Sequence, residues 1–200
     1  MMKIKTGIFS GSFNPVHIGH LSLANYLCEY EGLDEVWFVV SPLNPLKLTE
    51  NLLDEGKRLE LVEAAVAGYA KFQVSDVELS LPRPSYTVRT LEYLRDKHPD
   101  RDFTLIVGSD NWNFFDCWKE ADRIIDRFEI LIYPRRAYPI DRLSSLPPTV
   151  RVAKAPLLDI SSSFIREALV QGKDLTFFLH PASCKIIKEE RLYQNQKTKQ

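Results

Sequence analysis

Two histidines, His17 and His20, stand where an apolar run that ends near Phe9 gives way to a helix-like pattern. If the helix begins beside His17, a spacing of three residues puts both imidazoles on one side of its first turn. The backbone N–H groups and the positive dipole end of that turn attract anions. Gly11 relaxes the preceding turn, and Gly19 lets a nucleotide approach the backbone closely. These residue types at this spacing predict a phosphate-binding site.

The competing interpretation is that the two histidines only cap a turn between a strand and a helix. That reading suits a single histidine, whereas the combination of glycines and histidines over residues 11–20 favours a phosphate site. The sequence contains neither G-x-G-x-x-G nor G-x-x-x-x-G-K-[ST], which excludes the dinucleotide fingerprint and the P-loop. The hydrolase motif G-x-S-x-G and the zinc motif H-E-x-x-H are also missing. A phosphate site of another kind is therefore expected.

Three serines and an arginine cluster at the start of a helical segment near the other end of the chain. Ser161, Ser162 and Ser163 lead into an apolar stripe, and Arg166 follows within a turn. Serine is a good N-cap, so simple capping is the competing interpretation. A cation near a helix N-terminus opposes the dipole unless an anion lies between them. A polyphosphate at this helix start would reconcile the two.

A further polar segment, Pro84-Ser85-Tyr86-Thr87, precedes another helical pattern. Thr87 and the neighbouring N–H groups could accept a carboxylate at a second positive helix end. Equally, Ser85 or Thr87 could serve only as an N-cap, and the sequence leaves both interpretations open.

Gly108, Ser109 and Asp110 directly follow a buried apolar run. Open α/β sheets bind ligands beyond the carboxyl ends of their strands, where this segment would lie. The Asp110 carboxylate suits the diol of a ribose.

Aromatic residues gather just after this segment, at Phe114, Phe115 and Trp118, with Lys119 beside them. By itself such a cluster is more typical of a core than of a binding surface. Lys47 and Arg58 flank a loop after the second apolar run, and both are candidates for phosphate binding. Arg58 could equally be an exposed helix charge.

The elements that would position these residues alternate along the chain. Short β-branched or aromatic runs alternate with helix-period segments, which is typical of α/β proteins with parallel crossovers. Two runs lack polar alternation, so we expect a doubly wound, mostly parallel sheet with helices on both faces. The expected strands are Lys3–Phe9, Glu35–Val40, Phe72–Ser75, Phe103–Val107, Phe128–Ile132 and Val150–Ala153. The expected helices are Gly19–Tyr30, Asp54–Ala67, Thr87–Lys97, Lys119–Asp126, Ser162–Gln171 and Ser183–Glu190.

Composition restricts the class of protein. The 200 residues, 44% of them hydrophobic, suit one globular domain over residues 1–193 with a polar tail at 194–200. A net charge of −1 provides no general field for nucleic acid or an anionic membrane, so small molecules are the expected partners. Cys28, Cys117 and Cys184 are too widely spaced for a disulfide framework or a zinc site. Without an apolar leader or a run of ~18 apolar residues, the chain is expected to be cytoplasmic.

Two of these motifs carry a family resemblance. His17-Ile18-Gly19-His20 and the segment Ile160–Arg166 resemble the paired signatures of the nucleotidyltransferase superfamily with an H-x-G-H motif. Within it, the chain resembles the bacterial nicotinate-nucleotide adenylyltransferases over nearly its whole length, through Pro84–Thr87, Gly108–Asp110 and Trp118.

Departures from the family pattern are small. Ser12 and Ser163 stand where the family often has threonine, which keeps the hydroxyl. Asn14 stands where aspartate is common, which removes a charge and with it the basis for a metal role at that position.

The resemblance implies a Rossmann-like fold and adenylyl transfer from ATP to nicotinate mononucleotide, and the chemistry of the ATP phosphates implies Mg²⁺ as cofactor. The products would be deamido-NAD, for NAD biosynthesis, and pyrophosphate. The resemblance makes His17, His20 and Arg166 the catalytic candidates and places Trp118 against the pyridine ring. The expected ATP contacts are Gly11, Ser12, Phe13, His17, Gly19, His20, Gly108, Asp110, Ile160, Ser161, Ser162, Ser163 and Arg166. The expected contacts to the mononucleotide are Lys47, Ser85, Tyr86, Thr87, Trp118 and Lys119, and no side chain is assigned as a metal ligand.

Other functions compete with this one. Nicotinamide mononucleotide or phosphopantetheine could be the acceptor instead, although the latter would not require Pro84–Thr87 or Trp118. A nucleotide-binding sensor without turnover would not need the histidines and Arg166 intact. An oxidoreductase is disfavoured because G-x-G-x-x-G is missing. The oligomeric state stays open.

Overall fold

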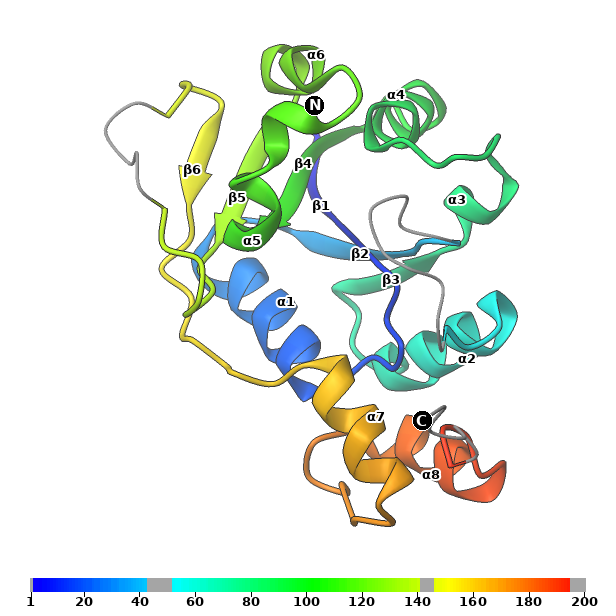
Figure 1. The fold of residues 1–200 in the computed structure, drawn as a ribbon. Helices are drawn as coiled ribbons and strands as arrows, with labels where there is room; N and C mark the ends of the chain where they lie inside the picture. Colours follow the sequence, from blue (N-terminus) through cyan, green and yellow to red (C-terminus); the bar gives the residue numbers. More distant parts are fainter. Residues whose placement is uncertain (1, 43–51, 141–145, 195–200) are drawn as a thin grey trace.

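A six-stranded sheet forms the centre of the molecule (Figure 1). The computed structural model describes residues 2–42, 52–140 and 146–194. The sheet has the order β3-β2-β1-β4-β5-β6, and each neighbouring pair is parallel. Its strands are β1 (Ile4–Gly11), β2 (Glu35–Val40), β3 (Phe72–Ser75), β4 (Arg101–Gly108), β5 (Glu129–Tyr133) and β6 (Val150–Val152). The predicted Rossmann-like α/β class is confirmed, and these strands are entirely rather than mostly parallel.

Every segment predicted to be helical is a helix, with ends within two residues of the expected positions. The helices are α1 (Ile18–Tyr30), α2 (Glu55–Val66), α4 (Thr87–Lys97), α6 (Ala121–Arg127), α7 (Ser162–Val170) and α8 (Pro181–Glu189). Three short pieces were not predicted: α3 (Val77–Ser80), α5 (Ser109–Trp112) and the 3₁₀ helix η1 (Phe115–Cys117). A segment of three or four residues completes about one turn, which is too short for a 3.6-residue period to show in the sequence.

Helices cover both faces of the sheet because consecutive strand residues point to opposite sides. Phe9 of β1 packs in one core with residues of α1, α2, α7 and α8. Its neighbour Ile8 packs in a second core with residues of α4, η1 and α6. Figure 1 shows these two groups of helices on either side of the sheet.

The strand order reverses direction at β1, and this reversal determines where a ligand can bind. The chain runs from β1 outward to β2 and β3, and then crosses back to place β4 on the other side of β1. The connections leave β1 and β4 toward opposite faces, which opens a crevice beyond their carboxyl ends. Gly11 ends β1 and Gly108 ends β4, so the two glycine-containing motifs meet at this crevice.

Within residues 2–42, 52–140 and 146–194, no helix is long and apolar enough to cross a membrane.

Candidate active site

A cavity of about 510 Å³ lies at the carboxyl edge of the sheet. It collects predicted site residues from four separate parts of the chain. These residues are Gly11, Ser12, Phe13, His17, His20, Ser85, Tyr86, Thr87, Gly108, Asp110, Trp118, Lys119, Ile160, Ser161, Ser162, Ser163 and Arg166. The structure therefore brings the four sequence motifs to one place.

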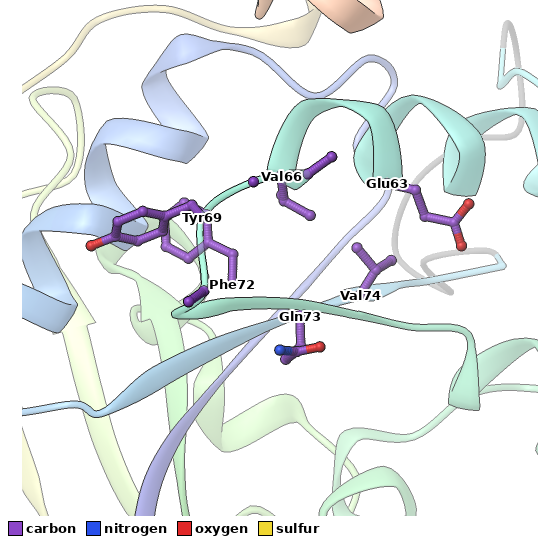
Figure 2. Close-up of a pocket in the computed structure, with 9 residues that line it drawn as sticks. Glu63, Val66, Tyr69, Phe72, Gln73 and Val74 are labelled. Atoms are coloured by element: carbon purple, nitrogen blue, oxygen red, sulfur yellow. The ribbon is translucent and has the colours of Figure 1, made fainter.

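A second hollow lies at the edge strand β3, beside the end of α2 (Figure 2). Its lining includes Val66, Tyr69, Phe72 and Val74. It contains none of the predicted site residues, and Figure 2 shows mainly aliphatic and aromatic side chains there. The first cavity is therefore the candidate active site.

The two histidines form one unit at the start of α1. Their rings are stacked with centroids 3.8 Å apart, as expected from the spacing of three residues. The backbone N–H of His17 donates to Nδ1 of His20 at 3.3 Å. Because Nδ1 of His20 accepts this hydrogen bond, the proton of the neutral imidazole is carried by Nε2. His20 thus combines the role of a helix cap with a defined orientation in the cavity.

His17 is neutral at neutral pH. Only 4% of the residue is exposed, and burial lowers its pKa to about 4, with a further contribution from the positive charge of Arg135. Its imidazole is therefore a neutral hydrogen-bonding group, and the positive charge at the cavity comes from Arg135, Arg166 and Lys119.

Gly19 makes room for the imidazole of His17. It is not among the residues that line the cavity, and a Cβ atom there would lie 3.1 Å from the His17 ring. Its approach to a nucleotide stays a prediction.

Phe13 holds the turn between β1 and α1 in a strained conformation. Its φ of 43° is in the left-handed region, which a residue other than glycine rarely adopts. Its ring packs edge-on against Phe9 and His20, with centroid distances of 5.6 and 5.2 Å. Burial of the Phe13 ring offsets the strain, and its edge-on contact supports the ring of the catalytic candidate His20.

The start of α7 confirms helix capping by a serine, whereas a polyphosphate at this helix start stays a prediction. Ser161 is the N-cap, since its Oγ accepts from the N–H of Phe164 at 3.1 Å. The hydroxyl of Ser162 donates to the carbonyl of Pro15 at 3.0 Å and so ties α7 to the histidine loop. Capping therefore occurs, and it occurs at the edge of the cavity.

Arg166 bridges the two signature motifs. Its Nη1 donates to the carbonyl of Asn14 at 2.8 Å, and its Nη2 donates to Oγ of Ser163 at 3.2 Å. The guanidinium is half-buried and lines the cavity. A preorganised cation at this position suits an anionic ligand.

The end of β4 holds an ion pair that was not predicted. Nε of Arg135 lies 3.1 Å from Oδ1 of Asp110, and its Nη2 donates to the Tyr133 hydroxyl at 2.9 Å. The Arg135 N–H donates to Oγ of Ser109 at 2.9 Å. One Asp110 oxygen is therefore held by an arginine, which orients the carboxylate in the cavity. The signal for Arg135 was its position two residues after the end of the strand Glu129–Tyr133, at the same edge of the sheet.

The segment before α4 presents a helix N-terminus to the cavity. The helix begins at Thr87 with Tyr86 as its N-cap, and no side chain accepts a capping hydrogen bond there. The alternative in which Ser85 or Thr87 is the cap is wrong, because Ser85 instead contacts the Glu78 carbonyl at 3.4 Å. The first N–H groups of α4 are thus available to an anion in the cavity.

The aromatic cluster divides between core and cavity. Phe115 is 1% exposed and belongs to the core, whereas Phe114 is 60% exposed. Trp118 is half-buried, packs against Phe115 with centroids 4.9 Å apart and lines the cavity. The core residue Phe115 therefore supports the Trp118 ring, and the ring borders the space where a ligand would bind.

Two further predicted residues have other positions. Lys47 lies outside the described residues. Arg58 is neither an exposed helix charge nor a cavity residue: it is fully buried, and its guanidinium donates to backbone carbonyls. The sequence prediction missed this because the local pattern of α2 shows a charge without showing that loops fold over it.

Asn14 has a structural role. Its Oδ1 accepts from the Tyr193 hydroxyl at 3.0 Å and from the Leu53 N–H at 3.2 Å. The residue is 4% exposed. The side chain therefore connects the histidine loop to Tyr193 and to the segment before α2.

The chain is similar to known proteins over most of its length. The family model described as cytidylyltransferase-like matches residues 8–168. A protein of Bacteroides fragilis (strain YCH46) named probable nicotinate-nucleotide adenylyltransferase is 59% identical over 187 residues, covering 94% of this chain and 92% of its own length. A protein of the same name from Porphyromonas gingivalis (strain ATCC 33277) is 48% identical, with 87% of this chain and 88% of that protein covered.

The fold also matches solved structures. The Plasmodium falciparum nicotinic acid mononucleotide adenylyltransferase complexed with NaAD superposes with a TM-score of 0.78 at 21% identity. The match covers 94% of this chain and 97% of that one, so the two proteins share the whole fold.

Proposed function

This chain belongs to the nicotinate-nucleotide adenylyltransferase family, and we propose that it transfers the adenylyl group of ATP to nicotinate mononucleotide. The products are deamido-NAD and pyrophosphate, and the reaction is a step of NAD biosynthesis. One observation carries the proposal: the histidine pair, the α7 start, the α4 N-terminus and Trp118 line a single cavity.

The reaction needs no protein base. A phosphate monoester has a second pKa near ~6, so the mononucleotide is mostly dianionic at neutral pH and is itself the nucleophile. Its oxygen forms a bond to the α-phosphorus of ATP, and the bond between that phosphorus and the oxygen linking it to the β-phosphorus breaks, so that this oxygen leaves as a terminal oxygen of pyrophosphate. Catalysis then consists of aligning the two phosphates and stabilising the charge that develops on pyrophosphate.

The ATP phosphates lie, in this proposal, between the start of α1 and the start of α7. The oriented Nε2–H of His20 and the Arg166 guanidinium would donate to them. The neutral His17 stacks on His20 and holds it in place, in addition to any phosphate contact of its own. Asp110, oriented by Arg135, would bind the ribose diol.

Nicotinate would occupy the other part of the cavity. Its ring would stack on Trp118, and its carboxylate would accept from the first N–H groups of α4 at Thr87. Lys119 adds a positive charge at the rim.

The donors at the cavity suit phosphates better than a metal. Among the described residues no group of three or more His, Cys, Asp or Glu side chains could hold a metal ion. We therefore propose that Mg²⁺ arrives bound to the ATP phosphates, with those oxygens and water as its main ligands. When bound, it would neutralise charge on the phosphates.

Arg166→Ala is expected to lower kcat/KM for ATP at least ~10-fold, because a charge-assisted phosphate contact acts in both the ground state and the transition state. The measurement is initial-rate kinetics with ATP varied at saturating mononucleotide. Arg151→Ala is the control, since Arg151 pairs with Glu31 away from the cavity. Unchanged ATP kinetics in Arg166→Ala would remove this residue from the site.

The acid substrate is expected to exceed the amide by at least ~10-fold in kcat/KM, because the carboxamide NH₂ would face N–H donors and leave them unpaired. A two-by-two assay of nicotinate or nicotinamide mononucleotide with ATP or GTP, following pyrophosphate, measures this preference. It also distinguishes a sensor, which releases no pyrophosphate, and a phosphopantetheine enzyme, which uses neither mononucleotide. Trp118→Ala should weaken the binding of both mononucleotides, because it removes the stacking contact. The preference for the acid should remain, since stacking does not depend on the ring substituent. Equal use of acid and amide would reject the assignment of this pocket.

A further inference from the structure

A buried carboxyl group lies among the residues that line the active-site cavity and has no part in the mechanism above. Glu78 of α3 is 4% exposed. It lines the same cavity as Ser85, Tyr86 and Thr87, the residues at the start of α4. A negative charge at this position would oppose a substrate whose ring carries a carboxylate.

Three hydroxyl groups from different parts of the chain surround the Glu78 carboxyl group. Ser10 lies at the end of β1, Ser41 directly after β2, and Thr90 within the first turns of α4. The hydroxyl oxygen of Ser10 is 3.0 Å from Oε1, that of Thr90 is 3.2 Å from Oε1, and that of Ser41 is 2.7 Å from Oε2. The Ser10 and Ser41 oxygens are also 2.9 Å from each other.

The number of protons in this cluster distinguishes the two forms of Glu78. Four oxygen–oxygen contacts lie within hydrogen-bond distance, but the three hydroxyls provide only three protons. An ionised carboxylate provides none, so one contact would join two oxygens without a proton between them. A protonated Glu78 provides the fourth: it donates to Ser41, Ser41 to Ser10, and Ser10 and Thr90 to Oε1.

We propose that Glu78 is protonated when the mononucleotide binds and that its neutral form determines the preference of the pocket for an anionic ring. This inference rests on the proposed function. Burial raises the pKa of Glu78, and the three hydroxyls oppose that rise only in part. Across the described residues, no charged side chain contributes to this shift, so no cation from a neighbouring element offsets the loss of solvation.

The test compares acid and amide substrates as the pH rises. Both mononucleotides carry the same 5′-phosphate and react with the same ATP, so the ratio of their kcat/KM values cancels those titrations. Because burial raises the pKa of Glu78, the wild-type ratio should fall at least ~5-fold as the pH is raised and Glu78 ionises. In Glu78→Gln, whose amide is neutral and can also donate to Ser41, the ratio should stay constant. A ratio with the same pH dependence in both proteins would overturn the proposal.

A second measurement needs no substrate. The infrared spectrum of the wild-type protein should show the C=O stretch of a buried, protonated carboxylic acid near neutral pH, and this band should disappear as the pH rises. Glu78 is the described carboxyl group whose pKa is raised, so the band has one expected source. It should be absent from Glu78→Gln and retained in Glu60→Gln, which changes a glutamate with 48% of its side chain exposed. If the band is absent while the acid preference is present, this inference fails and the proposed function stands; if the band is present without turnover, the proposed function fails alone.

Discussion

His20→Ala is expected to lower kcat by about 10²–10³-fold, because it removes a preorganised donor to charge that develops in the transition state. The structure orients this donor: Nδ1 accepts the His17 N–H, which leaves the ring proton on Nε2. Steady-state kinetics with both substrates saturating, with pyrophosphate as the product measured, gives the loss in kcat. A variant with near-normal turnover would exclude His20 from catalysis.

Three further variants identify the atom responsible. His20→Gln puts an amide N–H close to the position of Nε2, whereas His20→Asn replaces only the acceptor at Nδ1, so glutamine should recover more activity than asparagine. His98→Ala is the control, because His98 packs against Trp37 beside the opposite end of the sheet. If asparagine restored the rate and glutamine did not, the role of His20 would be to cap α1 rather than to donate to phosphate.

Arg58→Ala is expected to lower the free energy of unfolding by about 3–5 kcal/mol, since it leaves several buried carbonyls unpaired. The guanidinium donates to the carbonyls of Ser12, Ser41, Pro42 and Leu53 at distances of 2.6 to 3.2 Å. These carbonyls belong to the loops after β1 and β2 and to the segment before α2. One side chain therefore holds together two loops that border the active site.

Urea unfolding followed by circular dichroism measures this effect. Lys57→Ala is the matched control: the neighbouring residue on α2 forms surface ion pairs with Glu60 and Glu190, and such pairs contribute only ~0–1 kcal/mol. The free energy of unfolding of Arg58→Lys should remain well below that of the wild type, because a lysine ammonium lacks the planar guanidinium that reaches several carbonyls. A loss in Arg58→Ala no larger than in Lys57→Ala would contradict the role of Arg58 as a loop clamp.

Acid conditions should expose the effect of His17 on stability. The pKa of His17 in the folded protein is lowered to about 4, so the unfolded chain binds this proton more readily. The neutral His17 therefore contributes to the free energy of unfolding at pH values above the ordinary histidine pKa of 6.5, and this contribution is lost as the pH falls toward about 4.

The sequence by itself determined the strands, the longer helices and the edge at which the candidate site lies. Buried strands such as Val36–Val40 show unbroken apolar runs, and helices such as α2 show a 3.6-residue period, because each pattern reports which faces are covered. The motifs at Gly11 and Gly108 each directly follow a strand. Parallel strands bring their carboxyl ends to one edge, so the assembly of these motifs followed from their order along the chain.

The tertiary structure alone decided which polar groups pair across that edge. Arg58 is buried because two loops fold over it, Asp110 is held by Arg135 from the next strand, and Glu78 collects hydroxyls from Ser10 and Ser41. Periodicity records whether a residue faces the interior, but it carries no information about a partner that is distant in the chain. Backbone carbonyls, which satisfy Arg58, are the same for every residue type. Their positions depend only on how the loops cross, and that is settled when the sheet and its helices pack.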